Sequence, residues 1–178
     1  MNIFKNRFSL WTTKYKVLFC IFYIFMEISH AAENCTTCRE CPAGWPRIGD
    51  SCYFFSVLKL NWFRAKHACE NMGSHLATLQ TFMEDMFASI YLRNIQTHLP
   101  GASYIWMGGS DLDKEGQWKW VTGEPFSYTN WRKGGTNGQI QAPDNDMGLE
   151  HCLDWSNGWN DNKCDVDYHF LCEKDICV

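Results

Sequence analysis

The 178-residue sequence has no apolar run of the length that a membrane-spanning helix needs. Its main apolar run, Val17 to Met26, has ten residues, about half of the roughly 20 required. Four basic residues precede this run and small residues follow it, which is the pattern of a secretory signal peptide. We therefore expect a signal peptide over residues 1–31, a secreted, extracellular protein and no stable membrane insertion. A type II membrane anchor is the alternative, since the positive flank suits one.

The sequence also lacks the motifs of common hydrolases. It contains no Gly-x-Ser-x-Gly nucleophile elbow and no His-Glu-x-x-His zinc helix, and no cysteine is free to pair with a histidine as a nucleophile. Clustered carboxylates could mimic a glycosidase pair, but they are better explained as ligands of a cation. We expect a binding protein and not an enzyme.

Basic charge is scarce beyond the signal segment, where 12 Lys and Arg residues face 19 Asp and Glu residues. The resulting negative charge makes nucleic acid and anionic membranes poor partners. Acidic residues crowd the second half of the chain, as they would if some of them held a cation. Internal repeats are absent, and the length that remains is typical of one domain.

Cysteine, in contrast, is abundant, because nine of the ten cysteines follow the signal segment. In an exported chain these residues are expected to form disulfides. The spacing Cys35-x-x-Cys38-x-x-Cys41 could hold a metal in a reducing compartment, but export disfavours that interpretation. Because nine is an odd number, one thiol stays free or pairs with another chain.

Periodicity predicts two helices. Apolar side chains recur at helical spacing over residues 62–72, and Gly73 is a helix stop. Thr81 and Glu84 can form a capping box that opens a second helix, through about Leu92. The expected buried face of this second helix consists of Met83, Met86, Phe87 and Ile90.

Shorter patterns predict strands around a long irregular segment. A hairpin is expected at the Gly49-Asp50 turn, and a strand over residues 75–79. Residues 123–165 show little regular periodicity, which is costly in a compact domain unless the segment is functional. Calcium is the simplest agent that could order it. Further strand-sized runs lie at 104–107, 117–121 and 168–172.

A series of anchor residues runs through positions 41–174. They are Cys41…Cys52-Tyr53, Trp62-x-x-Ala65-x-x-x-Cys69, Trp106-Met107-Gly108, Trp118-x-Trp120-x-x-Gly123, Trp131, Glu150-x-Cys152, Trp159-Asn160-Asp161, Cys164 and Phe170-x-Cys172-Glu173. In their order and spacing they resemble the C-type lectin-like domain. Most of the tryptophans among them are expected in the core, while Trp155 stays open as a surface on which a sugar could stack.

The resemblance implies an α+β fold, stapled by disulfides, in which two helices flank small antiparallel sheets and a long calcium-binding loop region lies on top. It places the domain at residues 41–174, between a short tail at 32–40 and another at 175–178. We further predict that Cys177 bonds Cys35 or Cys38, and that the remaining cysteine links a homodimer. The pairings that the resemblance implies are Cys41–Cys52, Cys69–Cys172 and Cys152–Cys164.

The resemblance also implies a principal calcium site that binds glycans. Sugar-binding members hold the ion with a Glu-Pro-Asn or Gln-Pro-Asp triplet, a glutamate before a loop cysteine, and an Asn-Asp pair after a tryptophan. The triplet here reads Ala142-Pro143-Asp144, and Pro143 matches the cis-proline of the family. The residues implied to hold Ca²⁺ and the carbohydrate are Asp144, Glu150, Asn160 and Asp161.

Position 142 departs from that pattern. The methyl group of Ala142 can neither coordinate calcium nor accept a hydrogen bond from a sugar hydroxyl, although Gln141 could replace it if the loop shifted by one residue. The Pro-Asp pair leans towards the galactose-type triplet, but the aromatic residue that would stack on galactose is missing from the segment that follows, 145–147.

An accessory calcium site is implied at Asp111 and Glu115, with Asn145 able to assist. His151 stands where the family has an acidic ligand, and neutral imidazole is a poor ligand for this hard cation. We expect this site to be weak or empty, and Asp111 and Glu115 to be surface loop residues.

Two functions follow from these residues. The first is calcium-dependent recognition of microbial or self glycans. The second is recognition of a protein or a surface by a lectin-like domain that has lost sugar binding, and it is favoured by the altered triplet at Ala142.

Overall fold

The computed structural model describes residues 40–134 and 141–176, which begin at a β-hairpin. Strand β1 (Arg47–Ile48) pairs antiparallel with β2 (Ser51–Leu60), and Ile48 lies opposite Ser51. Gly49 in the turn has a φ of 61°, in the left-handed region that glycine adopts without strain. The predicted hairpin is confirmed. The expected signal peptide and the cysteines at 35, 38 and 177 lie outside the described residues.

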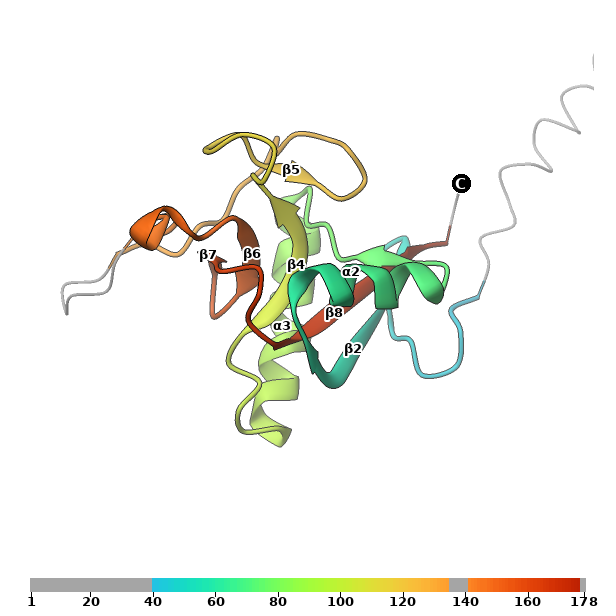
Figure 1. The fold of residues 1–178 in the computed structure, drawn as a ribbon. Helices are drawn as coiled ribbons and strands as arrows, with labels where there is room; N and C mark the ends of the chain where they lie inside the picture. Colours follow the sequence, from blue (N-terminus) through green and yellow to red (C-terminus); the bar gives the residue numbers. More distant parts are fainter. Residues whose placement is uncertain (1–39, 135–140, 177–178) are drawn as a thin grey trace, which may run out of the picture. The chain divides into compact units, whose positions relative to one another are not determined.

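One connected sheet forms the centre of the fold, in the order β1-β2-β8-β4-β6-β7 (Figure 1). Two-residue strands extend it, because β3 (His75–Leu76) pairs with β8 and β5 (Lys119–Trp120) pairs with β4. All pairs are antiparallel except β4 with β8. The remaining strands are β4 (Ile105–Ser110), β6 (Cys152–Trp155), β7 (Trp159–Asn162) and β8 (Tyr168–Asp175).

Helix α2 (Trp62–Asn71) covers one face of this sheet. The side chain of Asn61 caps it by accepting a hydrogen bond from the Arg64 amide. Gly73, with a φ of 64°, follows the helix as predicted. The buried positions are Trp62, Ala65 and Cys69, which share one helical stripe.

Helix α3 (Phe82–His98) covers the opposite face, and the predicted capping box between Thr81 and Glu84 is formed. The helix continues six residues beyond the predicted end at Leu92, up to the residues before Pro100. The predicted buried face was wrong, because side chains on the opposite stripe pack inward instead. Met83, Phe87 and Ile90 are exposed and Met86 is only half-buried, whereas Asp85, Ala88 and Leu92 are buried.

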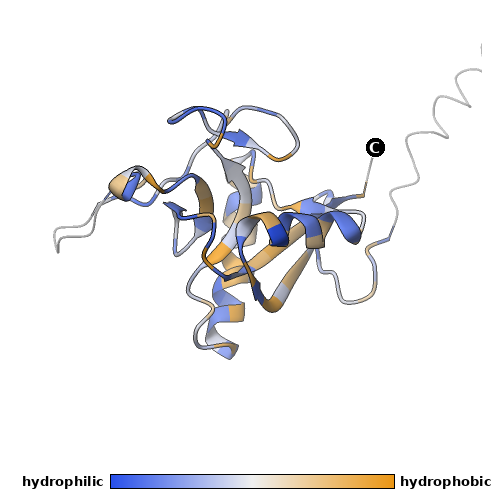
Figure 2. Cartoon of the chain, in the orientation of Figure 1, coloured by the Kyte–Doolittle hydropathy of each residue, from blue (hydrophilic) through white to orange (hydrophobic). Residues whose placement is uncertain are grey.

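Alternating side chains on the strands create a core on each face of the sheet. Ile105, Met107 and Leu171 pack with α3, whereas Trp106 and Phe170 pack with α2. In Figure 1, α2 lies in front of β8 and α3 lies behind β4. Figure 2 shows the hydrophobic residues concentrated in these central strands and mostly hydrophilic residues along α2.

Three disulfides fix these layers: Cys41–Cys52, Cys69–Cys172 and Cys152–Cys164. The second closes a loop with a sequence separation of 103 residues and joins α2 to β8. Closing a loop of that length contributes about 4.7 kcal/mol in the chain-entropy model. The three pairings that the resemblance implied are therefore formed.

Two expectations about irregular segments need correction. Residues 123–165 are not irregular throughout, since they contain the 3-10 helix η1 (Asp146–Gly148) and the β6–β7 hairpin. The expected C-terminal tail begins too early, because Asp175 belongs to β8 and Ile176 is buried. Among the described residues, no helix combines the length and the apolar character needed to span a membrane.

Candidate metal centre

The candidate metal centre lies where the long loop after β5 returns to the β6–β7 hairpin. Asp161 belongs to β7, opposite Leu153 of β6, and is fully buried. Asp144 and Glu150 come from the loop segment between residue 141 and β6. The rigid hairpin therefore fixes one carboxylate, and the loop brings the other two to it.

The turn at Pro143 delivers this loop to Asp161. The Ala142–Pro143 peptide bond is cis. Both oxygens of the Asp161 carboxylate lie 3.1 Å from the backbone nitrogen of Asp144, and one accepts a hydrogen bond from the Asn145 amide at 2.7 Å. A buried carboxylate that accepts backbone amides is held in one orientation. Asp161 thus organises the loop as well as facing the centre.

Three carboxylates converge at this point. One oxygen from each of Asp144, Glu150 and Asp161 lies within 4.8 Å of the others. Partial desolvation and the charges of Asp161 and Asp146 raise the pKa of Asp144, and burial raises the pKa of Glu150 with help from its acidic neighbours. Such a cluster favours a bound cation, and oxygen-only ligands suit Ca²⁺. These residues can therefore hold a metal ion.

Two of the residues in the family pattern do not complete this cluster. The side chain of Ala142 is buried and offers no ligand. Asn160 is also buried, but its amide oxygen accepts a hydrogen bond from Arg132 Nη2 at 2.7 Å. Its amide nitrogen donates to Asp154 and to the backbone carbonyl of Asp161. The structure thus brings together three of the four proposed side-chain ligands and engages the fourth elsewhere.

Arg132 is a residue of this region that sequence reasoning missed. Its backbone amide donates to the Trp159 carbonyl at 2.8 Å, and its carbonyl accepts from the Ala142 amide at 3.0 Å. The residue therefore joins the β7 strand to the loop that carries the cis-proline. No local pattern signals this contact, because Arg132 and Asn160 are 28 residues apart in sequence.

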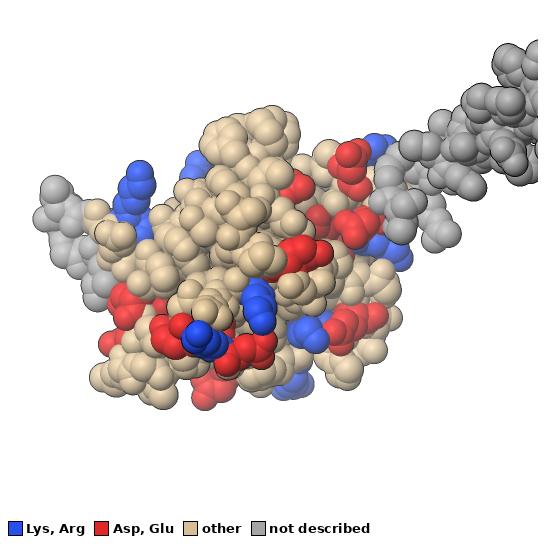
Figure 3. Space-filling model, turned by 90° about the horizontal axis from the view of Figure 1, so that it is seen from above, with Lys and Arg blue, Asp and Glu red and all other residues tan. Residues whose placement is uncertain are grey.

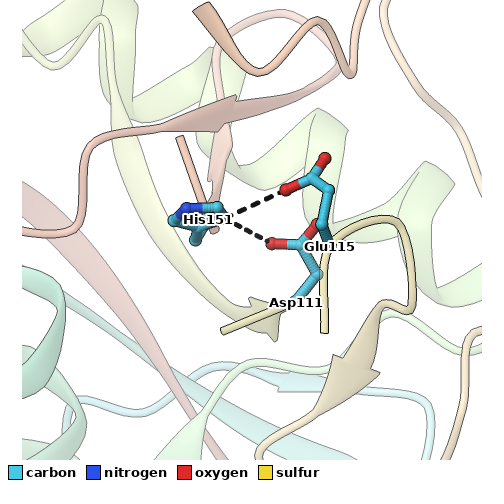
Figure 4. Close-up of side chains that lie close together, drawn as sticks. All are labelled: Asp111, Glu115 and His151. Carbon is cyan, nitrogen blue, oxygen red and sulfur yellow. Dashed lines mark hydrogen bonds and ion pairs between the residues drawn. The ribbon is translucent and has the colours of Figure 1, made fainter. Parts of the chain in front are cut away.

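The second cluster, Asp111, Glu115 and His151, is shown in Figure 4. His151 Nδ1 lies 3.1 Å from Asp111 Oδ1 and 3.2 Å from Glu115 Oε2. The imidazole therefore faces both carboxylates through one nitrogen. Asp111 is buried, contrary to the expectation of a surface residue, whereas Glu115 is exposed. The side-chain oxygen of Asn145 accepts a hydrogen bond from the Glu150 amide at 3.0 Å.

A buried carboxylate on α3 holds the strand and the loop that lead to the metal centre. Asp85 Oδ1 accepts a hydrogen bond from Trp159 Nε1 at 2.8 Å, and Trp159 directly precedes the Asn160-Asp161 pair in the sequence. Asp85 Oδ2 accepts from Tyr128 Oη at 3.1 Å and from Asn130 Nδ2 at 2.6 Å. Asp85 thus ties the helix to β7 and to the long loop.

The aromatic residues near the site are mostly structural. Trp155, a candidate stacking surface from the sequence, is fully buried and donates a hydrogen bond to Ser89 Oγ at 3.0 Å, so that interpretation was wrong. Trp131 is only partly buried against the core. The tryptophans at 62, 106, 120 and 159 are buried, and the partly buried Trp118 packs against the cluster that contains Trp120 and Trp159.

Known proteins with similar sequences include C-type lectins. Perlucin of Haliotis laevigata is 38% identical over 140 residues, which make up 76% of this chain and 83% of perlucin. C-type lectin domain family 4 member M of Gorilla gorilla gorilla is 36% identical over 141 residues, or 77% of this chain. The matched region spans only about a third, 34%, of that relative.

Solved structures share the fold as well. The mouse scavenger receptor C-type lectin carbohydrate-recognition domain matches with a TM-score of 0.61 and 34% identity, covering 76% of this chain and 98% of that domain. A calcium-independent type II antifreeze protein matches with a TM-score of 0.61 and 27% identity, covering 76% and 95%. Residues 58–174 match the family described as the lectin C-type domain. The chain therefore belongs to the C-type lectin domain family.

Proposed function

We propose that this protein is a calcium-dependent lectin whose ion is held by Asp144, Glu150 and Asp161. The observation that carries the proposal is the convergence of these three carboxylates within 4.8 Å. When bound, Ca²⁺ supplies open coordination positions that vicinal sugar hydroxyls can fill. Asp161 is the fixed member of the set, because it is buried in β7 and accepts two backbone amides of the loop.

The same geometry predicts a modest affinity for calcium. Calcium takes six to eight oxygen ligands, and the side chain at position 142 contributes none. Asn160 would have to release Arg132 before its amide oxygen could join the shell. Water and sugar hydroxyls then fill a larger share of the coordination sphere, and weak binding per domain makes any dimerisation valuable.

Binding of the purified protein to a glycan array, with millimolar calcium and again with a chelator, tests this proposal. We expect a signal that the chelator abolishes and that Asp161→Asn removes. Asp167→Asn, an exposed acidic residue before β8, is the matched control and should bind as the wild type does. Galactose-terminated and mannose-terminated glycans on one array decide the sugar class. A signal that survives chelation would overturn the calcium dependence.

The second candidate function is recognition of a protein or a surface without calcium. Its supporting observation is Ala142, whose buried methyl group stands at a ligand position. A calcium-independent antifreeze protein with this fold supplies a precedent. Ala142→Glu separates the two candidates. If this substitution creates chelator-sensitive sugar binding that the wild type lacks, the wild type belongs to the second class.

We infer an extracellular binding protein without catalytic activity. The signal-like segment at residues 1–31 and the three disulfides support export, since such bonds persist in oxidising compartments. The inferred disulfide-linked homodimer rests on the odd number of cysteines, nine, that follow the signal segment. Non-reducing electrophoresis tests it: a dimer band is expected, and a monomer band with one titratable thiol would contradict it.

A further inference from the structure

An open hollow of about 650 Å³ lies between the long loop and the β6–β7 turn. It is lined by residues from α3, from the segment before β4, from the long loop at 130–133 and from the β6–β7 turn at 156–158. This volume is typical of a site for a small ligand. Tyr104 and Trp131 supply aromatic surface in the lining, and serine and asparagine side chains supply hydrogen-bonding groups.

The charge of the hollow is entirely positive. Arg93, Arg132 and Lys133 line it, and no acidic residue does so among the described residues. Over the described part of the chain, none of these three cations has a carboxylate within ion-pair distance. Elsewhere basic and acidic side chains are interspersed, as the face in Figure 3 shows. The charge of Arg132 acts on Asp144 and Asp154 and opposes the rise in their pKa, whereas Arg93 and Lys133 are exposed. In a domain with an acidic balance, a hollow lined by cations and no acidic residue is a place for an anion.

Arg132 connects this hollow to the metal centre. Its Nη2 donates to Asn160, the residue before Asp161 on β7, and its Nη1 donates to Ser156 Oγ at 3.3 Å, so the guanidinium links the lining of the hollow to the strand that carries Asp161. A guanidinium has five donors, and these bonds use two of them. A sugar bound at the metal centre would therefore have the cationic hollow beside it.

We propose that the hollow binds the acidic group of a glycan, a sulfate ester or a carboxylate, carried on or next to the sugar at the metal centre. The predicted preference of the protein for acidic over neutral glycans depends on the proposed calcium-dependent lectin function. Anion binding in the hollow itself does not require calcium, since every residue that lines it is separate from the three carboxylates. The two claims can therefore be tested apart.

The first experiment measures anion binding in chelator. Sodium sulfate and free N-acetylneuraminic acid are titrated into the full chain at constant ionic strength and followed by NMR or thermal shift. We expect saturable binding that Arg93→Ala/Lys133→Ala weakens about tenfold, as the loss of two solvent-exposed charge contacts would. Lys59→Ala/Arg64→Ala, which removes two exposed cations from β2 and α2, should leave binding unchanged. Equal effects of the two double variants would overturn the proposal.

The second experiment compares neutral, sulfated and sialylated forms of the same glycans in millimolar calcium. The wild type should prefer one or both acidic forms, and which form it prefers identifies the acidic group. Arg93→Ala/Lys133→Ala should lose that preference and keep neutral binding. Neutral binding without acidic preference overturns the hollow proposal and leaves the lectin function intact. Anion binding in chelator without any glycan signal overturns the lectin function alone.

Discussion

Removal of the buried carboxylate of Asp85 should destabilise the domain strongly. The carboxylate accepts hydrogen bonds from Trp159, Tyr128 and Asn130, and Asp85 is only 2% exposed. Asp85→Ala leaves the buried indole N–H of Trp159 unpaired, which costs about 1–3 kcal/mol. Tyr128 is partly buried and Asn130 is exposed, so both can find water and each adds roughly 0.5–1 kcal/mol. The free energy of unfolding should therefore fall by about 3 kcal/mol.

Thermal unfolding followed by circular dichroism measures this loss. For a domain of this size about 3 kcal/mol lowers Tm by about 10 °C. Asp113→Ala is the matched control, because its side chain is 80% exposed and its ion pair with Lys119 contributes at most about 1 kcal/mol. Calcium affinity of Asp85→Ala should also fall, since Trp159 precedes the Asn160-Asp161 pair. A loss of stability below about 1 kcal/mol would refute this assignment of Asp85.

Three further predictions concern the metal sites and pH. Ala142→Glu should tighten calcium binding about tenfold in calorimetry by adding a ligand, and an unchanged affinity would show that position 142 does not reach the ion. His151→Asp should add a second calcium site at Asp111, whereas His151→Ala, which supplies no oxygen ligand, should not; single-site binding by both variants would contradict this. Burial raises the pKa of Asp154 to about 7, so the folded protein keeps a proton that the unfolded chain loses near pH 4. With calcium removed by a chelator, the free energy of unfolding should therefore fall by up to about 4 kcal/mol as pH rises from about 4 to 7. Asp154→Asn should lack this fall, and a wild type with the same pH dependence as Asp154→Asn would contradict the prediction.

Features that depend on neighbouring residues could be predicted from the sequence. The capping box at Thr81 and Glu84, the stop at Gly73 and the turn at Gly49 each need only a few consecutive residues. The cysteine pairings came from the family resemblance, since spacing alone leaves many pairings open. The convergence of Asp144, Glu150 and Asp161 was likewise anticipated through the resemblance.

Features that depend on distant contacts escaped prediction. Helix α3 carries apolar side chains on two stripes, and the stripe that is buried includes Asp85, which contacts Trp159 across 74 residues of sequence. The contact between Arg132 and Asn160 likewise joins residues far apart in the sequence. Trp155 illustrates a third case, because its aromatic ring suits a sugar surface and a core equally well, and only the packing decides.

Calorimetric titration of calcium into the wild type and Asp161→Asn tests the central claim most directly. We expect a principal binding event in the wild type that is lost in Asp161→Asn and kept in the control Asp167→Asn, with both variants shown to be folded by circular dichroism. Calcium binding of equal strength in Asp161→Asn, or no binding to the wild type at millimolar calcium, would contradict it.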